Sequence, residues 1–454
     1  MPVTHVSPNA SDLLQGAFHL DYTTAHILGS LFDRDSDKPL HRLKRRLASA
    51  YGAYWSLPST NGTTILNILA LLSACPMGGR VLVNRDAHSS ATAALIHGGF
   101  EPVYLTPEYD AELGLSTGPT LARFEALLGR ERVDCVFLTC PNYFGIVADI
   151  AGIIDLAHVR GIPVVVDAAH APHFHFCSAL PVGAEDLGAD LVAQSTHKVA
   201  TALSQGSLLL LKNPDFIDAL YEHVNELGFV STSFSYPILV SLELGVQQLV
   251  DEGEAIWSRT VERAERFRRD LGALSTITCF GRDRAPSPGF HDLDATRITL
   301  DVSRTGLTGF DVERQLNAES IYPEMATLRH VLFLVTPGTM ESDLERLHES
   351  LVRIDRAGRA RSPRSFPLPP PLPAMAVIPR TAKFSPKSTV LLRDAVGRVC
   401  GETISAYPPG APVIAAGEIV SSEAIEYLRC LKRSGAALRG AADEQFETLR
   451  VLSS

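Results

Sequence analysis

Short apolar runs alternate with helical patterns along the first half of the chain. Apolar residues at Leu40, Leu43 and Leu47 recur at the spacing of one helix face and predict a helix over residues 40–51. A strand at 54–57 is expected to end at Pro58. Further strands are expected at 80–84, 102–105, 134–139 and 164–166, and helices at 61–74, 89–97, 121–128 and 150–160. This alternation predicts a mainly parallel sheet with helices on both faces.

The pattern changes in the second half. Helices are expected at 216–227 and 237–271, and residues 275–355 mix strands at 296–302 and 331–335 with helices, which predicts a smaller α+β domain. A proline-rich run at 363–373 is typical of a stiff extended linker. The expected organisation is an arm at 1–39, a large domain at 40–272, a small α+β domain at 273–358, a linker at 359–375 and a C-terminal domain at 376–454.

Composition narrows the class of protein. A chain of 454 residues is too long for one simple core, which agrees with several domains. The net charge of −10, with only a short basic patch at 42–46, argues against nucleic acid and membrane surfaces as partners. The seven cysteines form no CxxC pair and sit mostly in apolar runs, as free thiols do in a reducing compartment. No signal peptide or run of about 18 apolar residues is evident, so we expect a cytoplasmic protein.

Two apolar runs each end in residues that are capable of chemistry. Asp167 follows the run at 163–166, and Ser195, His197 and Lys198 follow the run at 190–193. Ligands of open α/β sheets bind beyond the carboxyl ends of the strands. An Asp and a Lys there suit pyridoxal phosphate (PLP), because the amine forms a Schiff base with the aldehyde and the carboxylate pairs with the ring nitrogen. Taken singly, each residue is more often a surface charge or a helix cap.

Two further segments fit a phosphate-bearing aromatic ligand. Asn61-Gly62-Thr63-Thr64 opens a helix, where backbone N–H groups and hydroxyls bind phosphate, although a plain helix cap explains it equally well. His88 follows the strand at 80–84, and its ring could stack on a ligand or simply cap a helix. Neither a G-x-G-x-x-G after a strand nor a P-loop motif is present, so dinucleotide and nucleoside-triphosphate sites are not expected.

A metal site is an alternative for one segment. His170, His173, His175 and Cys177 lie close together in the sequence, with Asp167 as a further ligand, and imidazole and thiolate suit zinc. Their spacing matches no standard structural zinc pattern, and no second cysteine pair completes it. A metal hydrolase that uses this cluster is therefore a minority interpretation.

Taken together, these segments resemble the Orn/Lys/Arg decarboxylase family, most closely its shorter bacterial members. The resemblance spans about residues 40–440 and rests on the motifs at 61–64, 85–90, 103–108, 141–147, 167–170 and 195–198, and on 394–398, 407–412 and 417–418 nearer the C-terminus. The family consists of PLP enzymes with the aspartate-aminotransferase fold. The resemblance therefore implies an α/β protein of PLP fold type I, whose large domain has a mainly parallel sheet flanked by helices, followed by a smaller α+β domain and a C-terminal α+β domain.

The resemblance also implies roles for individual residues. Lys198 would hold PLP and transfer protons at the substrate carbon, Asp167 would pair with the ring nitrogen, and His88 would stack on the ring. His170 would lie near the ring hydroxyl or the substrate, and Ala169 beneath the ring. The phosphate-binding residues would be Gly62, Thr63, Thr64, Ser195 and His197. Partner subunits complete each other's sites in this family, so a homodimer or a higher homo-oligomer is implied.

The chain departs from the family pattern at three places. The usual Pro-Gly-His-Lys near the N-terminus is replaced by residues 18–24, the usual Asp-Glu-Ala-His has Ala168, and the usual Pro-Thr-Tyr has Asn142. We expect these changes to fall where the substrate and the reaction are chosen. Glu324 matches an acidic position of the family and could meet a basic side chain, or it is an ordinary surface carboxylate.

The leading hypothesis is a PLP-dependent decarboxylase of an amino acid, most simply a basic one of the ornithine, lysine or arginine class, in polyamine biosynthesis. A second hypothesis keeps PLP but changes the reaction to transamination, elimination, cyclisation or oxidation in a specialised biosynthetic pathway. The metal hydrolase is a third. The intact Lys198 and Asp167 argue against a fourth, a catalytically inactive regulatory relative.

Overall fold

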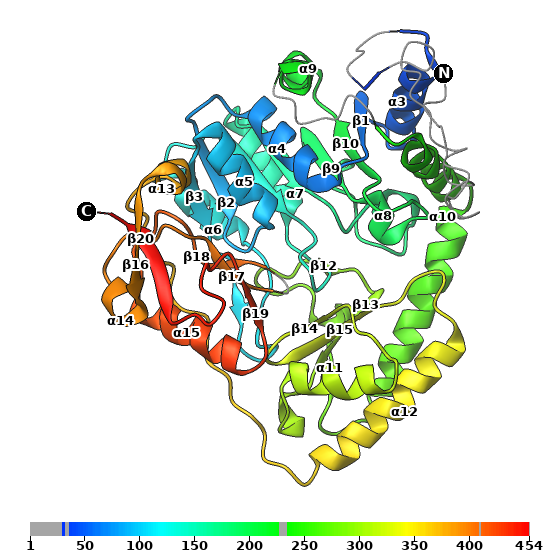
Figure 1. The fold of residues 1–454 in the computed structure, drawn as a ribbon. Helices are drawn as coiled ribbons and strands as arrows, with labels where there is room; N and C mark the ends of the chain where they lie inside the picture. Colours follow the sequence, from blue (N-terminus) through cyan, green and yellow to red (C-terminus); the bar gives the residue numbers. More distant parts are fainter. Residues whose placement is uncertain (1–29, 32–35, 227–233, 408–409, 454) are drawn as a thin grey trace, which may run out of the picture.

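A seven-stranded sheet forms the centre of the large domain in the computed structural model, which describes residues 30–31, 36–226, 234–407 and 410–453 (Figure 1). The strand order is β1-β10-β9-β8-β6-β2-β3. The strands are β1 (Trp55–Ser59), β2 (Arg80–Asn84), β3 (Glu101–Leu105), β6 (Cys135–Thr139), β8 (Val164–Asp167), β9 (Leu191–Gln194) and β10 (Ser207–Leu211). Five neighbouring strands, from β9 to β3, run parallel, and their carboxyl ends therefore share one edge.

Helices cover both faces of this sheet because successive strand residues point to opposite sides. Val81 and Val83 pack in the core that includes α4 (Thr63–Ala74), α5 (Ser89–Gly98) and α9 (Ile217–Glu226). Leu82 packs in the other core, with α6 (Leu121–Leu128), α7 (Ile150–Val159) and the helix α3 (Pro39–Ala50). The predicted α/β class, with a mainly parallel sheet flanked by helices, is confirmed.

The two strands at one side of the sheet differ from the prediction. β1 does not end at Pro58 but continues through it to Ser59, because β1 is an edge strand, where a residue without an N–H is tolerated. β10 was not predicted at all. Its Ser-Leu-Leu-Leu-Leu sequence is buried on both faces and shows no alternation, and it pairs antiparallel with β1 and with β9.

One long helix joins the large domain to a smaller α+β unit. α10 (Tyr236–Leu271) packs Leu239 and Leu242 in the large-domain core, whereas Phe267 and Leu271 belong to the next core. That second core includes residues of an antiparallel sheet and of a pair of helices. The sheet has the order β11 (Thr278–Cys279), β13 (Arg297–Asp301), β15 (His330–Leu334) and β14 (Met325–Ala326), and the helices are α11 (Gly309–Ala318) and α12 (Glu341–Gly358).

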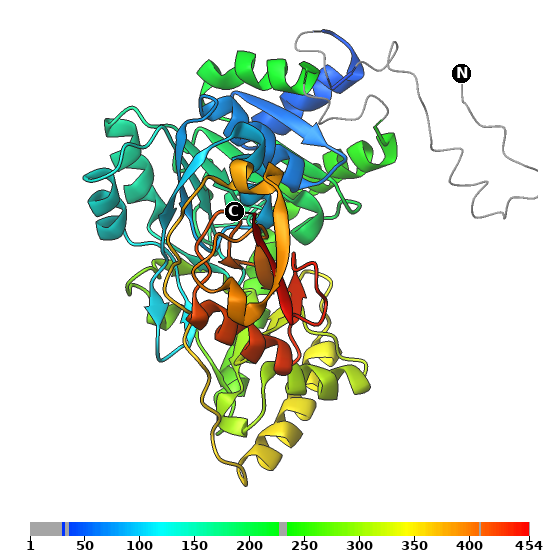
Figure 2. The same cartoon turned by 60° about the vertical axis from the view of Figure 1, so that its left-hand side comes forward.

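A third α+β unit follows the proline-rich segment, which has no regular secondary structure at 363–373. It contains α13 (Pro379–Phe384), α14 (Leu392–Ala395), α15 (Ser422–Arg433), the pair β16 (Lys387–Leu391) and β20 (Thr448–Leu452), and the sheet β18 (Pro412–Ile414), β17 (Ile404–Tyr407) and β19 (Ala437–Arg439). Figure 2 shows this unit, in orange and red, beside both preceding units. The domain boundaries expected from the sequence stay a prediction. In the described ranges, no helix is long and apolar enough to cross a membrane.

Candidate active site

The carboxyl ends of β8 and β9 open on a cavity of about 1450 Å³. Asp167 is the last residue of β8, and Ser195 follows β9 as the residue before the short helix α8 (Thr196–Val199), which carries Lys198. Both Asp167 and Lys198 line the cavity, so the strand ends deliver the carboxylate and the amine to the same space. Lys198 is open to solvent and lines this cavity.

The lining of this cavity comes from three regions of the chain. The large domain supplies every residue that the sequence predicts for the cofactor, and the small unit adds Phe310 and Leu328. The proline-rich residues 363–373 form a further part of the lining, with Tyr407 and Tyr427 of the C-terminal unit. The segment expected to be only a linker is thus also a wall of the cavity.

Hydroxyl groups gather at the start of α4. Thr63 Oγ1 lies 2.5 Å from Ser195 Oγ and donates to Ser207 Oγ at 3.0 Å. No side chain caps this helix, so its first N–H groups are available to an anion. Gly62 has φ +79°, and an added Cβ would meet no atom within 4 Å, which leaves open space beside the helix end. These features fit a bound phosphate without a positive side chain.

The other predicted phosphate residues lie around this helix end. Gly62, Thr63, Thr64, Ser195 and His197 all line the cavity. His197 also fixes the loop before β10, because its ring Nδ1 lies 2.9 Å from the Gly206 carbonyl oxygen and its N–H donates to the same oxygen. In this structure His197 therefore fixes the position of the loop that precedes Ser207.

Asp167 is a buried carboxylate with few partners. Only 2% of it is exposed, and its Oδ1 accepts a hydrogen bond from the Ala169 N–H at 3.1 Å. Burial raises the pKa of Asp167, and the nearby His88 and Lys198 act in the opposite direction. A protonated ring nitrogen placed against this carboxylate would supply the positive partner that a buried carboxylate needs. Asp167 therefore fits the ring-nitrogen role that the sequence predicts.

His88 is the N-cap residue of α5 and lines the same cavity. Its Nδ1 accepts from the Ser90 N–H at 3.2 Å and lies 2.9 Å from Ser90 Oγ, which fixes the ring. Burial lowers the pKa of His88, Asp167 opposes this shift and Lys198 adds to it. The residue is at once a helix cap and a ring open to the cavity, so both roles considered from the sequence are compatible.

His170 lies between Lys198 and an arginine from the small unit. Its Nε2 is 3.2 Å from Lys198 Nζ, and its Nδ1 is 2.8 Å from Nη2 of Arg297. The ring also packs edge-on against Tyr143, with 4.8 Å between centroids. Burial lowers the pKa of His170 well below its usual value, and Arg297 and Lys198 lower it further. Ala169, the preceding residue, lines the cavity as predicted for a residue beneath a ring.

Arg297 is a site residue that was not predicted from the sequence. It begins β13 and is 1% exposed, and its Nη1 donates to the Tyr143 carbonyl oxygen at 2.9 Å. Gly145, with φ +84°, makes room for it, because a Cβ there would lie 2.7 Å from Arg297 Cδ. Arg297 and His170 are 127 residues apart in the sequence, so no local sequence pattern predicts their contact. Asn67, which lines the cavity and donates to Ser90 Oγ at 3.0 Å, was also missed, as was Ser207, which accepts from Thr63.

Ala168 corrects one expectation. The carboxylate that is missing at this position was expected to influence the choice of substrate or reaction. Ala168 is instead 1% exposed and is part of the hydrophobic core. Its neighbours Asp167 and Ala169 line the cavity, whereas Ala168 does not, because alternate residues of an extended segment face opposite sides. The substitution therefore changes the core and leaves the cavity lining unaltered.

The other departures have different outcomes. Asn142 donates to the Ser116 and Thr117 carbonyl oxygens and accepts from the Phe144 and Ile146 N–H groups, so its amide is fully used in holding its own loop. A substrate contact by Asn142 stays a prediction that these contacts do not favour. The segment 18–24 lies outside the described residues.

Glu324 has a partner at the edge of the site. Its Oε1 accepts from the Tyr143 hydroxyl at 2.9 Å, and Tyr143 lines the cavity and contacts His170. Glu324 also raises the pKa of Lys198, although burial lowers that pKa more strongly. Glu324 is not part of the cavity lining, and it is linked to the cavity through its hydrogen bond with Tyr143.

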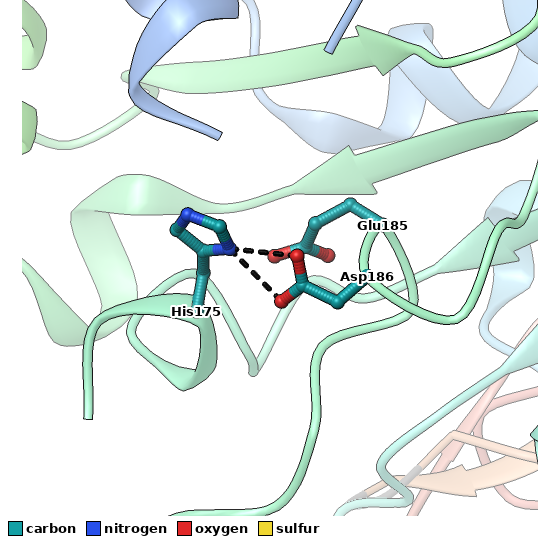
Figure 3. A group of neighbouring side chains, drawn as sticks. All are labelled: His175, Glu185 and Asp186. Atoms are coloured by element: carbon teal, nitrogen blue, oxygen red, sulfur yellow. Dashed lines mark hydrogen bonds and ion pairs between the residues drawn. The ribbon is translucent and has the colours of Figure 1, made fainter. Parts of the chain in front are cut away.

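The residues of the alternative zinc site do not come together. His170 contacts Lys198, His173 is buried 4.1 Å from the Trp257 ring, and Cys177 Sγ lies 3.6 Å from Ser258 Oγ. Figure 3 shows that His175 instead faces the Asp186 carboxylate, with Glu185 beside it. Among the described residues, this trio is the one group whose ligand atoms lie close enough together to hold a metal ion. It shares only His175 with the zinc site considered from the sequence.

Comparison with known proteins identifies relatives over most of the chain. The family profile described as "Orn/Lys/Arg decarboxylase, major domain" matches residues 15–296, and "Orn/Lys/Arg decarboxylase, C-terminal domain" matches residues 349–445. An arginine decarboxylase of Bacillus subtilis is 32% identical over 414 residues, which are 89% of this chain and 84% of the relative. The constitutive lysine decarboxylase of Escherichia coli is 26% identical over 492 aligned residues, covering 87% of this chain and 68% of that one.

Solved structures share the fold. The E. coli constitutive lysine decarboxylase matches with a TM-score of 0.79 at 23% identity, over 96% of this chain and 76% of that chain. A structure of SPT with PLP matches with a TM-score of 0.56 at 15% identity, over 70% of this chain and 77% of that chain. Similarity at these identities concerns the fold alone.

Proposed function

The chain belongs to the Orn/Lys/Arg decarboxylase family and is an amino-acid decarboxylase, a carbon–carbon lyase, and we propose that it uses PLP to remove the carboxylate of a basic amino acid. The observation that carries the proposal is the meeting of Asp167, Lys198 and the hydroxyl-lined helix end of Thr63 in one cavity. A carboxylate, an amine and an anion site are the three groups that PLP requires.

When bound, PLP accepts the electrons that remain on the substrate carbon after carbon dioxide leaves. The residues of this chain would bind and orient it. The Thr63 and Ser195 hydroxyls and the first N–H groups of α4 would hold the phosphate, and His88 would cover one face of the ring. Asp167 would keep a proton on the ring nitrogen, because its buried carboxylate favours a positive partner.

Proton delivery to the substrate carbon would fall to Lys198 and His170. Lys198 Nζ and His170 Nε2 lie 3.2 Å apart, within hydrogen-bonding distance. We assign Lys198 as the donor and His170 as its partner. Other reactions of PLP enzymes would use the same two residues, so the assignment of the reaction rests on the family and not on this pair.

Substrate recognition is proposed at Glu324. Glu324 lies beside the cavity residue Tyr143, whose hydroxyl orients the carboxylate through a 2.9 Å hydrogen bond, and a basic side chain that reaches past Tyr143 would meet it. Arginine, lysine and ornithine all present such a side chain. Because partner subunits complete each other's sites in this family, we also propose a homodimer, which light scattering of the purified chain tests directly.

The test of the proposed function compares Lys198→Ala with Lys212→Ala. Lys212 donates to the Gly52 carbonyl oxygen and does not line the cavity, so it controls for the loss of a lysine. We expect the wild type and Lys212→Ala to absorb visible light with bound PLP and to release carbon dioxide from at least one basic amino acid. Lys198→Ala should lose both properties.

Other outcomes separate the alternatives. If the protein forms a keto acid and releases no carbon dioxide, the reaction is transamination and not decarboxylation. Full carbon dioxide release by Lys198→Ala would overturn the assignment of the site.

A further inference from the structure

Two contacts link Arg297 to Lys198 through His170, and the chemistry of the donors determines where the protons of His170 lie. A guanidinium only donates hydrogen bonds. Its Nη2 lies 2.8 Å from His170 Nδ1, so Nδ1 must accept that bond. A neutral imidazole that accepts at one nitrogen carries its proton on the other. His170 therefore carries its proton on Nε2.

The Nε2–H group then points at Lys198, whose Nζ lies 3.2 Å away. An ammonium has no lone pair and cannot accept this proton, whereas a neutral amine can. We propose that Arg297 is a positioning residue that fixes the Nε2–H form of His170 and thereby holds Lys198 as a neutral, nucleophilic amine. This inference rests on the proposed role of Lys198 and adds a residue that contacts neither cofactor nor substrate atoms in that proposal.

The charges around the pair agree with this assignment. The charged or titratable groups that act on the pKa of Lys198 are Asp167, Arg297 and Glu324, with His88 close enough to be affected by Lys198. Those that act on the pKa of His170 are Arg297, Lys198, His88 and His173. Asp167 and Glu324 raise the pKa of Lys198, but its burial and Arg297 lower that pKa, and the net direction is downward. Burial also lowers the pKa of His88 and that of His173, to about 4 for His173, so Arg297 is the permanent cation beside the pair.

The fixed geometry of Arg297 makes it suited to this role. It is 1% exposed, its Nη1 is held by the Tyr143 carbonyl oxygen at 2.9 Å, and its Nε lies 3.5 Å from an oxygen of Asp294. The guanidinium is thus held on the side away from His170, and Nη2 is aimed at the ring. Its stem lies against Gly145, where no larger residue fits.

The first experiment measures Lys198 in the full chain after PLP has been removed. Trace labelling with acetic anhydride between pH 6 and 11 gives the midpoint at which Lys198 becomes a free amine, with the exposed Lys383 as the internal standard. Arg297→Met should raise this midpoint by about one pH unit. Arg297→Lys, which keeps a cationic donor, should stay nearer the wild type. An unchanged midpoint in a folded Arg297→Met protein overturns the proposal.

A second comparison separates the route through His170 from the direct charge of Arg297. In a His170→Ala background, Arg297→Met should shift the Lys198 midpoint by less than half as much as in the wild type. An equal shift in both backgrounds means that Arg297 acts by charge alone, and the relay is then wrong.

A third measurement does not depend on any variant of Arg297. In the unmodified chain labelled with ¹⁵N-histidine, His170 should show a protonated Nε2 and an unprotonated Nδ1, with its signal assigned by loss in His170→Ala. A proton on Nδ1 overturns the inference. All three readouts are taken without cofactor or substrate, so they can fail while decarboxylation stands, and decarboxylation can fail while they hold.

Discussion

Arg85 and Glu418 form a buried, two-point ion pair between the large domain and the C-terminal unit. Arg85 Nη1 lies 2.5 Å from Glu418 Oε1, and Nη2 lies 3.0 Å from Oε2. The Glu418 side chain has no exposed surface, and the guanidinium also stacks on the Tyr104 ring, 4.6 Å from its centroid. Since Arg85 directly follows β2 and precedes His88 by three residues, the pair fastens the C-terminal unit to the loop that carries a cofactor-site residue.

Breaking this pair should strongly destabilise the protein. Glu418→Ala leaves a buried, unpaired guanidinium, and we expect the free energy of unfolding to fall by about 3–5 kcal/mol. Urea denaturation of Glu418→Ala, Arg85→Ala and the double variant measures the coupling. The double variant should lose less than the sum of the single losses, and purely additive losses would contradict the pairing. Arg132→Ala, which removes a largely exposed partner of Asp134, is the control and should cost little.

The hydroxyl of Thr63 should contribute to cofactor affinity. Thr63→Val keeps the shape of the side chain but removes the contacts with Ser195 and Ser207, and we expect PLP to bind about tenfold more weakly. Thr63→Ser keeps the hydroxyl and should bind almost as the wild type does. Fluorescence titration of the PLP-free chain measures both, and equal affinities for Val and Ser would remove Thr63 from the phosphate site.

Neutralising Asp167 should impair turnover more than it impairs folding. Asp167→Asn keeps the size of the side chain but loses the negative charge next to the ring nitrogen, so we expect kcat to fall about a hundredfold or more. Asp155→Asn, on the exposed side of α7, is the matched control. A carbon dioxide release assay gives the rates, and a loss of less than about threefold would mean that the carboxylate is not the ring partner.

Stability should depend on the titration of Glu185. Burial raises the pKa of Glu185 from 4.5 to about 7, so the folded chain keeps a proton that the unfolded chain releases in this range. Stability therefore falls as the pH rises from about 4.5 and the loss is complete above about 7, in total roughly 3 kcal/mol. Glu185→Gln cannot release a proton and should remove this slope in denaturation at several pH values. The same change at the exposed Glu252 should leave the slope intact.

Glu324 should act on substrate affinity. Glu324→Gln removes the negative charge offered to a basic side chain, and we expect KM to rise about tenfold to a hundredfold with a smaller change in kcat. Tyr143→Phe keeps the carboxylate but frees it from its 2.9 Å hydrogen bond, and a smaller rise in KM is expected. Identical KM values for Glu324→Gln and the wild type would place the recognition of the basic group elsewhere.

The parts of the site that depend on local sequence could be predicted. Asp167 and Lys198 each follow a buried strand, and the shared edge of parallel strands brings them to one cavity. The contact of Arg297 with His170 could not be predicted, because it depends on how the small unit packs on the large one. The zinc hypothesis failed because closeness in sequence does not make His173 and His175 face the same way.

The same distinction holds for the fold. Helices and strands with a clear period appeared close to their expected positions, such as β2 at Arg80–Asn84 and α6 at Leu121–Leu128. β10 was not predicted, because a strand that is buried on both faces has no alternating polar positions by which its period could be recognised.

The proline-rich wall of the cavity has a thermodynamic consequence. A proline has a fixed φ and no N–H group, so residues 363–373 have few conformations to lose and few donors that must be satisfied when water leaves. A ligand that reaches this wall therefore meets a surface whose shape is already set, and little ordering entropy is lost on that side. One wall of the cavity is therefore shaped in part by the covalent geometry of the segment that connects two units.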